Sequence, residues 1–189
     1  MRYSETHKAA THQRIIEEAS RRFRRDGIAA TGLQPLMKAL GLTHGGFYAH
    51  FSSKDQLVEE ALAAAAEQLQ AACSALFAQE QPLQAFIDSY LSRAHRANPE
   101  AGCPLPTLSA ELGQRCQPSP LTDALVEDRL AMLAGALDRP GADETSVALL
   151  CTLVGALMLS RSIKDPELSD RVLDSARHWL HEQVEGHPA

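Results

Sequence analysis

Apolar residues between positions 31 and 54 recur at helical spacing in two short runs separated by a tight turn. Gly41 ends the first run, because glycine accepts the left-handed conformation of a helix C-terminus, and Leu42 can fold back onto the helix. The pattern therefore predicts a short helix that stops at Gly41. Its apolar residues share one face: Leu33, Leu36, Met37 and Leu40.

A second short helix is predicted directly after this turn. Thr43 offers a hydroxyl that can cap it, and Gly45 and Gly46 lie in its first turn. Each glycine costs about 1 kcal/mol inside a helix, so their presence suggests that a phosphate approaches the backbone closely. Phe47 and Phe51 are four residues apart and would be buried on one face. A helix, a glycine turn and a short helix are typical of the helix-turn-helix motif, whose second helix enters the DNA major groove.

The run from Gly41 to Lys54 resembles the N-terminal domain of the TetR family of bacterial transcriptional repressors. It matches the family's order of glycine, aliphatic, Ser/Thr, glycine, Tyr, Phe, two small residues and Lys. The resemblance covers about the first third of the chain. It implies an all-α fold of about nine helices, with a helix-turn-helix DNA-binding domain at 1–54 and a helical ligand-binding and dimerisation domain at 55–189.

The resemblance also implies which residues contact DNA. Thr31 or Gly32 takes the position that meets a phosphate, and Gln34 reaches a base edge, where glutamine pairs well with adenine. An exposed surface amide is the alternative at Gln34. The remaining expected contacts are the residues that face the groove, Thr43, His44, Gly45 and Gly46, and those that contact phosphates, Tyr48, His50 and Lys54.

Charge is distributed unevenly along the chain. Residues 1–54 hold nine Lys and Arg against four Asp and Glu, whereas residues 55–189 hold nine against twenty, and the whole chain has a net charge of −6. Phosphate contacts need local positive charge, because they act over a Debye length of about 8 Å. Four arginines crowd one helix end, where a solvated basic end and direct phosphate contact are both open: Arg21, Arg22, Arg24 and Arg25.

The rest of the chain also has helical periodicity. Residues 1–8 are polar and suggest a mobile arm, in which Arg2 and Lys8 could touch phosphates; a frayed terminus without such contacts is the favoured alternative. Further helices are expected at about 8–26, 53–79, 82–98, 121–138, 143–164 and 166–184. A short helix that ends at Gly113 is expected between the third and fourth of these. The alanine-rich helix at 53–79 suits a stiff lever between the two domains.

The last two helices carry wide apolar stripes. A monomer could bury them inside its own bundle, but the resemblance implies a four-helix bundle with a second subunit. Two recognition helices would then read half-sites about 34 Å apart. The residues expected at this interface are Val147, Cys151, Val154, Met158, Val172, Ala176, Trp179 and Leu180.

The family likeness implies release from DNA by a small hydrophobic molecule bound among the central helices. Each candidate lining residue could instead be plain core: Phe77, Phe86, Tyr90, Cys103, Leu108, Met132 and Met158. Cys103 follows Gly102 and precedes Pro104, a place that resembles the sensor thiol of family members that detect electrophiles or oxidants. A buried structural cysteine is the alternative reading.

Other function classes find less support in the sequence. No catalytic motif, phosphate-binding loop or cofactor site stands out, and His178 and His181 are read as a solvated helix face rather than metal ligands. The four cysteines have no metal-type spacing and are expected to be reduced. With no membrane span or signal peptide recognised, a cytoplasmic location is expected. A small α-helical enzyme or binding protein remains the remote alternative.

Overall fold

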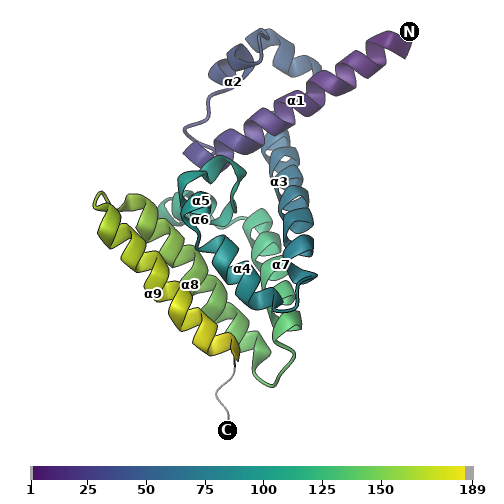
Figure 1. Ribbon diagram of the computed structural model, residues 1–189. Helices are drawn as coiled ribbons and strands as arrows, with labels where there is room; N and C mark the ends of the chain where they lie inside the picture. Colours follow the sequence, from purple (N-terminus) through teal and green to yellow (C-terminus); the bar gives the residue numbers. More distant parts are fainter. Residues whose placement is uncertain (1, 186–189) are drawn as a thin grey trace. The chain divides into compact units, whose positions relative to one another are not determined.

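The computed structural model describes residues 2–185, and every regular element in that range is a helix (Figure 1). The predicted all-α fold is confirmed. In chain order the elements are α1 (Arg2–Asp26), α2 (Leu33–Ala39), the 3₁₀ helix η1 (His44–Ala49), α3 (Lys54–Phe77), α4 (Pro82–Tyr90), α5 (Arg93–Ala97), the 3₁₀ helix η2 (Pro99–Ala101), α6 (Leu105–Gln114), α7 (Pro120–Leu137), α8 (Ala142–Ser162) and α9 (Pro166–Glu185).

The helices form two compact units. The first unit joins the chain up to Leu69 with Glu100–Gln117, and the second joins Gln70–Pro99 with the chain from Pro118 onward. Three crossings therefore connect the units covalently, and α3 begins in one unit and ends in the other. These crossings do not coincide with position 54, and the division of function predicted there stays a prediction.

The core of the first unit fixes the two short helices against α1 and the start of α3. Phe47 and Phe51 are both buried, as predicted, and their rings stack with centroids 5.3 Å apart. Burial of a large aromatic side chain contributes about 1.5–3 kcal/mol, so this pair anchors η1. The other large side chains of this core are Ile15, Phe23, Leu36, Met37 and Leu57.

The turn between α2 and η1 has the predicted conformation. Gly41 has φ +72°, its N–H donates to Lys38 O at 3.0 Å, and the N–H of Leu42 donates to Met37 O at 2.9 Å. These two bonds close α2 in a Schellman motif. The Thr43 hydroxyl then accepts a hydrogen bond from the N–H of Gly46 at 3.2 Å, which confirms the predicted cap of the second helix.

Two predicted boundaries are wrong. The arm expected at residues 1–8 is helical from Arg2, since this polar stretch contains no glycine or proline that would stop α1 from extending. The single helix expected at 82–98 is divided into α4 and α5. Ser92 causes this division, because its hydroxyl accepts from the N–H of His95 at 3.0 Å and caps a new helix.

In the second unit, α8 and α9 run side by side and α4 and α7 pack against this pair (Figure 1). Leu153, Leu157 and Leu173 form the centre of its core. Leu180 is also fully buried inside its own chain. Its predicted place in a subunit interface is therefore wrong, since a side chain without exposed area can lose none on dimerisation.

The α8 helix is apolar on faces that its own unit leaves open. It is the one helix among residues 2–185 whose length and composition would allow a membrane span, with a mean hydropathy of 1.5 over a window that is 33% buried. Val147 is 47% exposed and Cys151 is exposed, whereas Val154 and Met158 are half-buried. These four residues follow one helical face.

Candidate nucleic-acid interface and ligand cavity

The η1 helix presents polar and aromatic side chains to solvent above a buried anchor. Tyr48 is 62% exposed, and its ring packs edge-on against Phe47 with centroids 5.2 Å apart. His44 lies edge-on to Tyr48 at 6.0 Å and is also exposed, as are Thr43 and Gly45. The motif thus combines a fixed backbone with exposed hydrogen-bonding groups, as a groove-reading helix requires.

The two glycines of η1 are not explained by the chain's own packing. A Cβ at Gly45 would meet nothing within 4 Å, and one at Gly46 would meet Thr43 Oγ1 at an ordinary 3.4 Å. Neither residue has a positive φ. Larger side chains would therefore fit both positions in the isolated chain, which favours an external group that approaches this backbone.

His50 lies at the inner edge of this surface. Its Nδ1 is buried and has no hydrogen-bond partner among the described residues, and its ring centroid lies 6.0 Å from that of His12. Burial lowers the pKa of His50, and the charges of His12 and Lys8 lower it further. A neutral ring with its proton on Nε2 can still donate one hydrogen bond, so the predicted phosphate contact stays chemically feasible.

Thr31 and Lys54 hold the loop that leads into α2. The Thr31 side chain is buried and its hydroxyl donates to Gly27 O at 2.7 Å, so this hydroxyl is an internal contact and not a surface group. The Lys54 ammonium donates to Ile28 O at 2.6 Å and to Thr31 O at 2.7 Å. Lysine has three donors, and a phosphate contact through the third stays a prediction.

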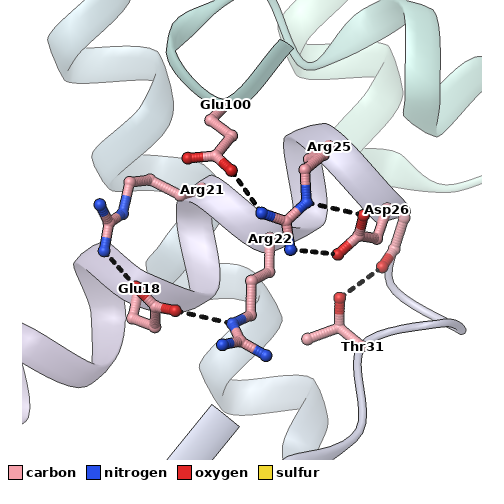
Figure 2. Close-up of polar contacts among 8 residues, drawn as sticks. Glu18, Arg21, Arg22, Arg25, Asp26, Thr31 and Glu100 are labelled. Atoms are coloured by element: carbon pink, nitrogen blue, oxygen red, sulfur yellow. Dashed lines mark hydrogen bonds and ion pairs between the residues drawn. The ribbon is translucent and has the colours of Figure 1, made fainter. Parts of the chain in front are cut away.

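The arginines at the end of α1 are engaged within the first unit (Figure 2). Asp26 has a lowered pKa because Arg25 hydrogen-bonds its carboxylate at 2.8 Å. The sequence left open a solvated basic end or direct phosphate contact for these arginines. Ion pairs within the unit disfavour direct phosphate contact. The other pairs in Figure 2 join Glu18 to Arg21 and Arg22, and Arg25 to Glu100.

A contact that the sequence analysis missed holds the same loop from α6. The Glu111 carboxylate accepts from the N–H groups of Ile28 at 2.7 Å and Ala29 at 2.9 Å, and the Thr107 hydroxyl donates to Arg24 O at 2.7 Å. We call Thr107 and Glu111 the α6 anchor. Their spacing of four residues places both on one helix face, but nothing local indicates the partner.

Gly27 is required by this arrangement in two ways. Its φ of +88° is left-handed, and a Cβ there would lie 2.5 Å from Glu111 Oε2. The sequence predicted Gly27 only as the end of α1.

The second unit contains a cavity of about 220 Å³ between α3 and α7. Two of its lining residues, Phe77 and Met132, were predicted. Phe86 and Tyr90 are buried in the same unit, and Met158 is half-buried on α8. Cys103 and Leu108 are buried in the first unit, so they do not line this cavity. The complete lining is Gln70, Cys73, Ser74, Phe77, Asp128, Arg129 and Met132.

Arg129 is one of the five lining residues that sequence reasoning missed. It is only 3% exposed and shares the buried face of α7 with Leu125 and Leu133. The available signal was its spacing, four residues from each of these leucines, which places an arginine on a core face. Arginine is almost never fully buried without a partner, so the burial of Arg129 indicates a role in binding.

Comparisons with known proteins agree on the kind of protein this is. The sequence model described as "Bacterial regulatory proteins, tetR family" matches residues 15–61. The chain is 28% identical over 180 residues to the uncharacterized HTH-type transcriptional regulator Rv0196 of Mycobacterium tuberculosis, covering 89% of this chain and 93% of the relative.

Solved structures show the same fold. A TetR transcriptional regulator from Chloroflexus aurantiacus superposes with a TM-score of 0.77 at 24% identity, covering 96% of this chain and 98% of that one. A TetR-family regulator from Cytophaga hutchinsonii gives 0.76 at 21% identity, covering 92% and 94%. Since the matched residues 15–61 include α2, the turn and η1, and the similar proteins align over nearly the whole chain, the comparisons together support a transcriptional regulator of the TetR type.

Proposed function

We propose that the chain is a repressor that binds a palindromic operator as a homodimer and leaves it when a small molecule binds in the second unit. The observation that carries the proposal is the η1 surface. Exposed polar side chains and two glycines without an internal role lie there on a buried aromatic anchor.

The proposed DNA contacts follow from this exposure. Thr43 and His44 face the base edges, and the exposed Gln34 reaches an adenine from α2. Tyr48 and His50 bind phosphates, and the backbone at Gly45 and Gly46 lets η1 approach the duplex closely. Thr31 supports these contacts by fixing the loop before α2.

Dimerisation is supported by the uncovered faces of α8 and α9. On α9, Trp179 is 44% exposed and Leu168 is 36% exposed, while Val172 and Ala176 between them are half-buried. Together with the open face of α8, they offer the apolar area that obligate interfaces bury. Exposed patches of this kind mark interaction sites in soluble proteins.

Ligand response is supported by the way the chain connects the units. The segment that carries the α6 anchor is joined to the second unit at both ends, after Pro99 and after Gln117. A ligand that prefers one arrangement of the second unit can therefore bias the position of α6, and with it the loop before α2. Such a ligand shifts the equilibrium only by its difference in affinity for the two arrangements.

Operator binding is tested with the full-length protein and a duplex from directly upstream of its coding sequence, followed by fluorescence anisotropy. We expect nanomolar binding whose logarithm falls linearly with the logarithm of salt concentration. Two protomers per palindromic site are expected. A salt-independent or sequence-independent interaction would reject the proposal and favour the remote enzyme or binding-protein alternative.

Tyr48→Phe is the matched variant for this assay. It removes one exposed hydroxyl and should weaken operator binding roughly 2- to 10-fold, the value of one hydrogen bond, while the melting temperature stays unchanged. The control is Ser109→Ala, which removes an exposed hydroxyl of α6 outside the proposed interface. Equal affinity of both variants would remove Tyr48 from the interface.

A second candidate mechanism keeps DNA binding but replaces the ligand with modification of Cys103. One observation favours it: Arg24, a buried cation of α1, interacts electrostatically with Cys103, and burial lowers the pKa of this arginine. Such a neighbour stabilises a thiolate. Cys103 is only 2% exposed, however, which slows attack by a reagent. Cys103→Ser should abolish the response to peroxide if this mechanism operates, and an unchanged response eliminates it.

A further inference from the structure

The cavity between α3 and α7 is lined by a buried charge, Arg129, whose Nη2 donates no hydrogen bond to the described residues. The Arg129 guanidinium has its Nη1 directed at two sulfur atoms, Cys73 Sγ at 3.1 Å and Met132 Sδ at 3.6 Å. Its Nη2 is buried and lacks a hydrogen-bond partner among the described residues. Sulfur is a weak acceptor, so a guanidinium with five N–H donors is left poorly solvated.

The carboxylate of Asp128 does not supply the missing hydrogen-bond acceptor for Arg129. Asp128 Oδ2 lies 3.6 Å from Arg129 Nη2, beyond hydrogen-bond distance, and the Asp128 side chain is 57% exposed. A solvent-exposed partner of this kind contributes little, because water screens the pair. Buried charges are normally paired and hydrogen-bonded, so an anion facing Nη2 would complete the surroundings of Arg129.

We propose that the cavity binds a small organic monocarboxylate, with Arg129 as its anchor; this rests on the proposed ligand-responsive function and names the ligand class. A carboxylate matches the planar guanidinium and can accept two parallel hydrogen bonds from it. The guanidinium presents its N–H donors in a rigid fork, which fits the two oxygens of a carboxylate without rearrangement.

The remaining lining sets the shape and charge of the ligand. Phe77 and Met132 supply an apolar wall, which suits an aromatic ring or a short alkyl chain. A cavity of roughly 150 Å³ holds a benzene ring, so about 220 Å³ holds a ring with one carboxylate. Arg129 is the one cation among the lining residues, so the lining has no partner for a second negative charge and a monoanion fits better than a phosphate or a dicarboxylate.

The test uses benzoate and hexanoate with the full-length protein, followed by isothermal titration calorimetry and thermal denaturation. Benzamide is the matched probe, because it has the shape of benzoate without its charge. We expect both acids to bind and raise the melting temperature, and benzamide to bind at least roughly tenfold more weakly. Equal binding of benzoate and benzamide, or binding of neither acid at millimolar concentration, overturns the proposal without any variant.

Arg129→Met separates an anchor from a structural residue. An anchor without oxygen partners can be replaced by an apolar chain without loss of stability in the unliganded protein, while benzoate binding falls at least roughly tenfold. A structural arginine would give the opposite result, a lower melting temperature with benzoate binding retained. Asp128→Asn is the control variant and should strengthen benzoate binding, because it removes the only carboxylate of the cavity lining.

Operator binding is measured separately, so the two proposals fail in different ways. If the operator is bound and neither acid binds, the ligand class is wrong and the regulator stands. If the acids bind through Arg129 and no DNA is bound, the site stands and the proposed repressor fails. If both hold, benzoate should release the operator from the unmodified protein and not from Arg129→Met.

Discussion

Single residues in this protein carry roles that their positions in the sequence do not reveal. Lys54 closes the helix-turn-helix segment in the sequence pattern, yet its ammonium holds the carbonyls of Ile28 and Thr31. Arg129 looks like an ordinary helix charge, yet it lines a cavity and is almost fully buried. In both cases the environment of the charged group, and not its type, decides what it does.

Lys54→Met should destabilise the first unit by about 1.5–3 kcal/mol, the usual contribution of hydrogen bonds to a charged group. The change is measured by chemical denaturation of the full chain. Lys38→Met is the control, because Lys38 is exposed on α2. Unchanged stability together with a salt slope of operator binding that is smaller by about 0.9 would identify Lys54 as a phosphate contact instead.

At the scale of elements, α6 is the segment whose role is least local. It comes from the middle of the chain, yet its Thr107 and Glu111 hold the end of α1 and the loop before α2. The η1 helix is the converse case, because its cap, its preceding turn and its buried ring all lie within a few residues. The η1 helix therefore presents the proposed DNA surface, and α6 determines how firmly the loop before α2 is held.

Glu111→Ala should loosen the loop before α2. The N–H groups of Ile28 and Ala29 lose a charged acceptor, which costs about 1–3 kcal/mol, and operator affinity should fall with stability. Hydrogen exchange measures the change directly, since these two amides should exchange faster while those of the α8 core do not. Ser109→Ala, on an exposed face of α6, is the control, and equal protection in both variants would contradict a role for the anchor.

The short α5 helix makes the second unit sensitive to pH. Burial lowers the pKa of His95, whose Nδ1 lies 2.7 Å from Tyr90 O; this hydrogen bond opposes the shift, and the charge of Arg161 adds to it. The folded state therefore binds a proton on His95 less readily than the unfolded state does.

The uncharged, buried His95 therefore contributes to the free energy of unfolding above the pKa of an unfolded histidine, roughly 6.5. This contribution is lost as the pH falls toward the lower pKa of His95 in the folded state. His95→Gln should flatten this part of the stability curve between neutral and mildly acidic pH, as measured by urea denaturation. The lowered pKa of His50 gives a slope of the same sign, so the variant should reduce the slope and not abolish it. The exposed His178 serves as the control, as His178→Gln, and an unchanged slope in His95→Gln would contradict the assignment.

For the whole molecule, two features support the proposed homodimer. A single η1 helix reads too few base pairs for useful specificity, whereas a two-fold pair reads two half-sites. The open apolar faces of α8 and α9 would stay in water in a monomer. Pairing these faces satisfies both requirements with one symmetric interface.

Trp179→Arg should convert the proposed dimer into a monomer, because it places a charge on the open apolar face of α9. Analytical ultracentrifugation at micromolar concentration measures the change, and operator affinity should fall with it. Glu127→Arg, on the exposed side of α7, is the control. A variant at position 179 that sediments like the wild-type protein would place the interface elsewhere.

The sequence by itself determined the helix-turn-helix segment, with Gly41 in the left-handed conformation, the Thr43 cap and the buried Phe47 and Phe51. These features depend on neighbours within about four residues, so local pattern is enough to predict them. Only the tertiary structure decided the α6 anchor and the environment of Arg129, whose partners lie 83 and 56 positions away. It also decided that Leu180 faces the core and Trp179 the solvent, because a wide apolar stripe does not specify which of its sides a protein covers itself.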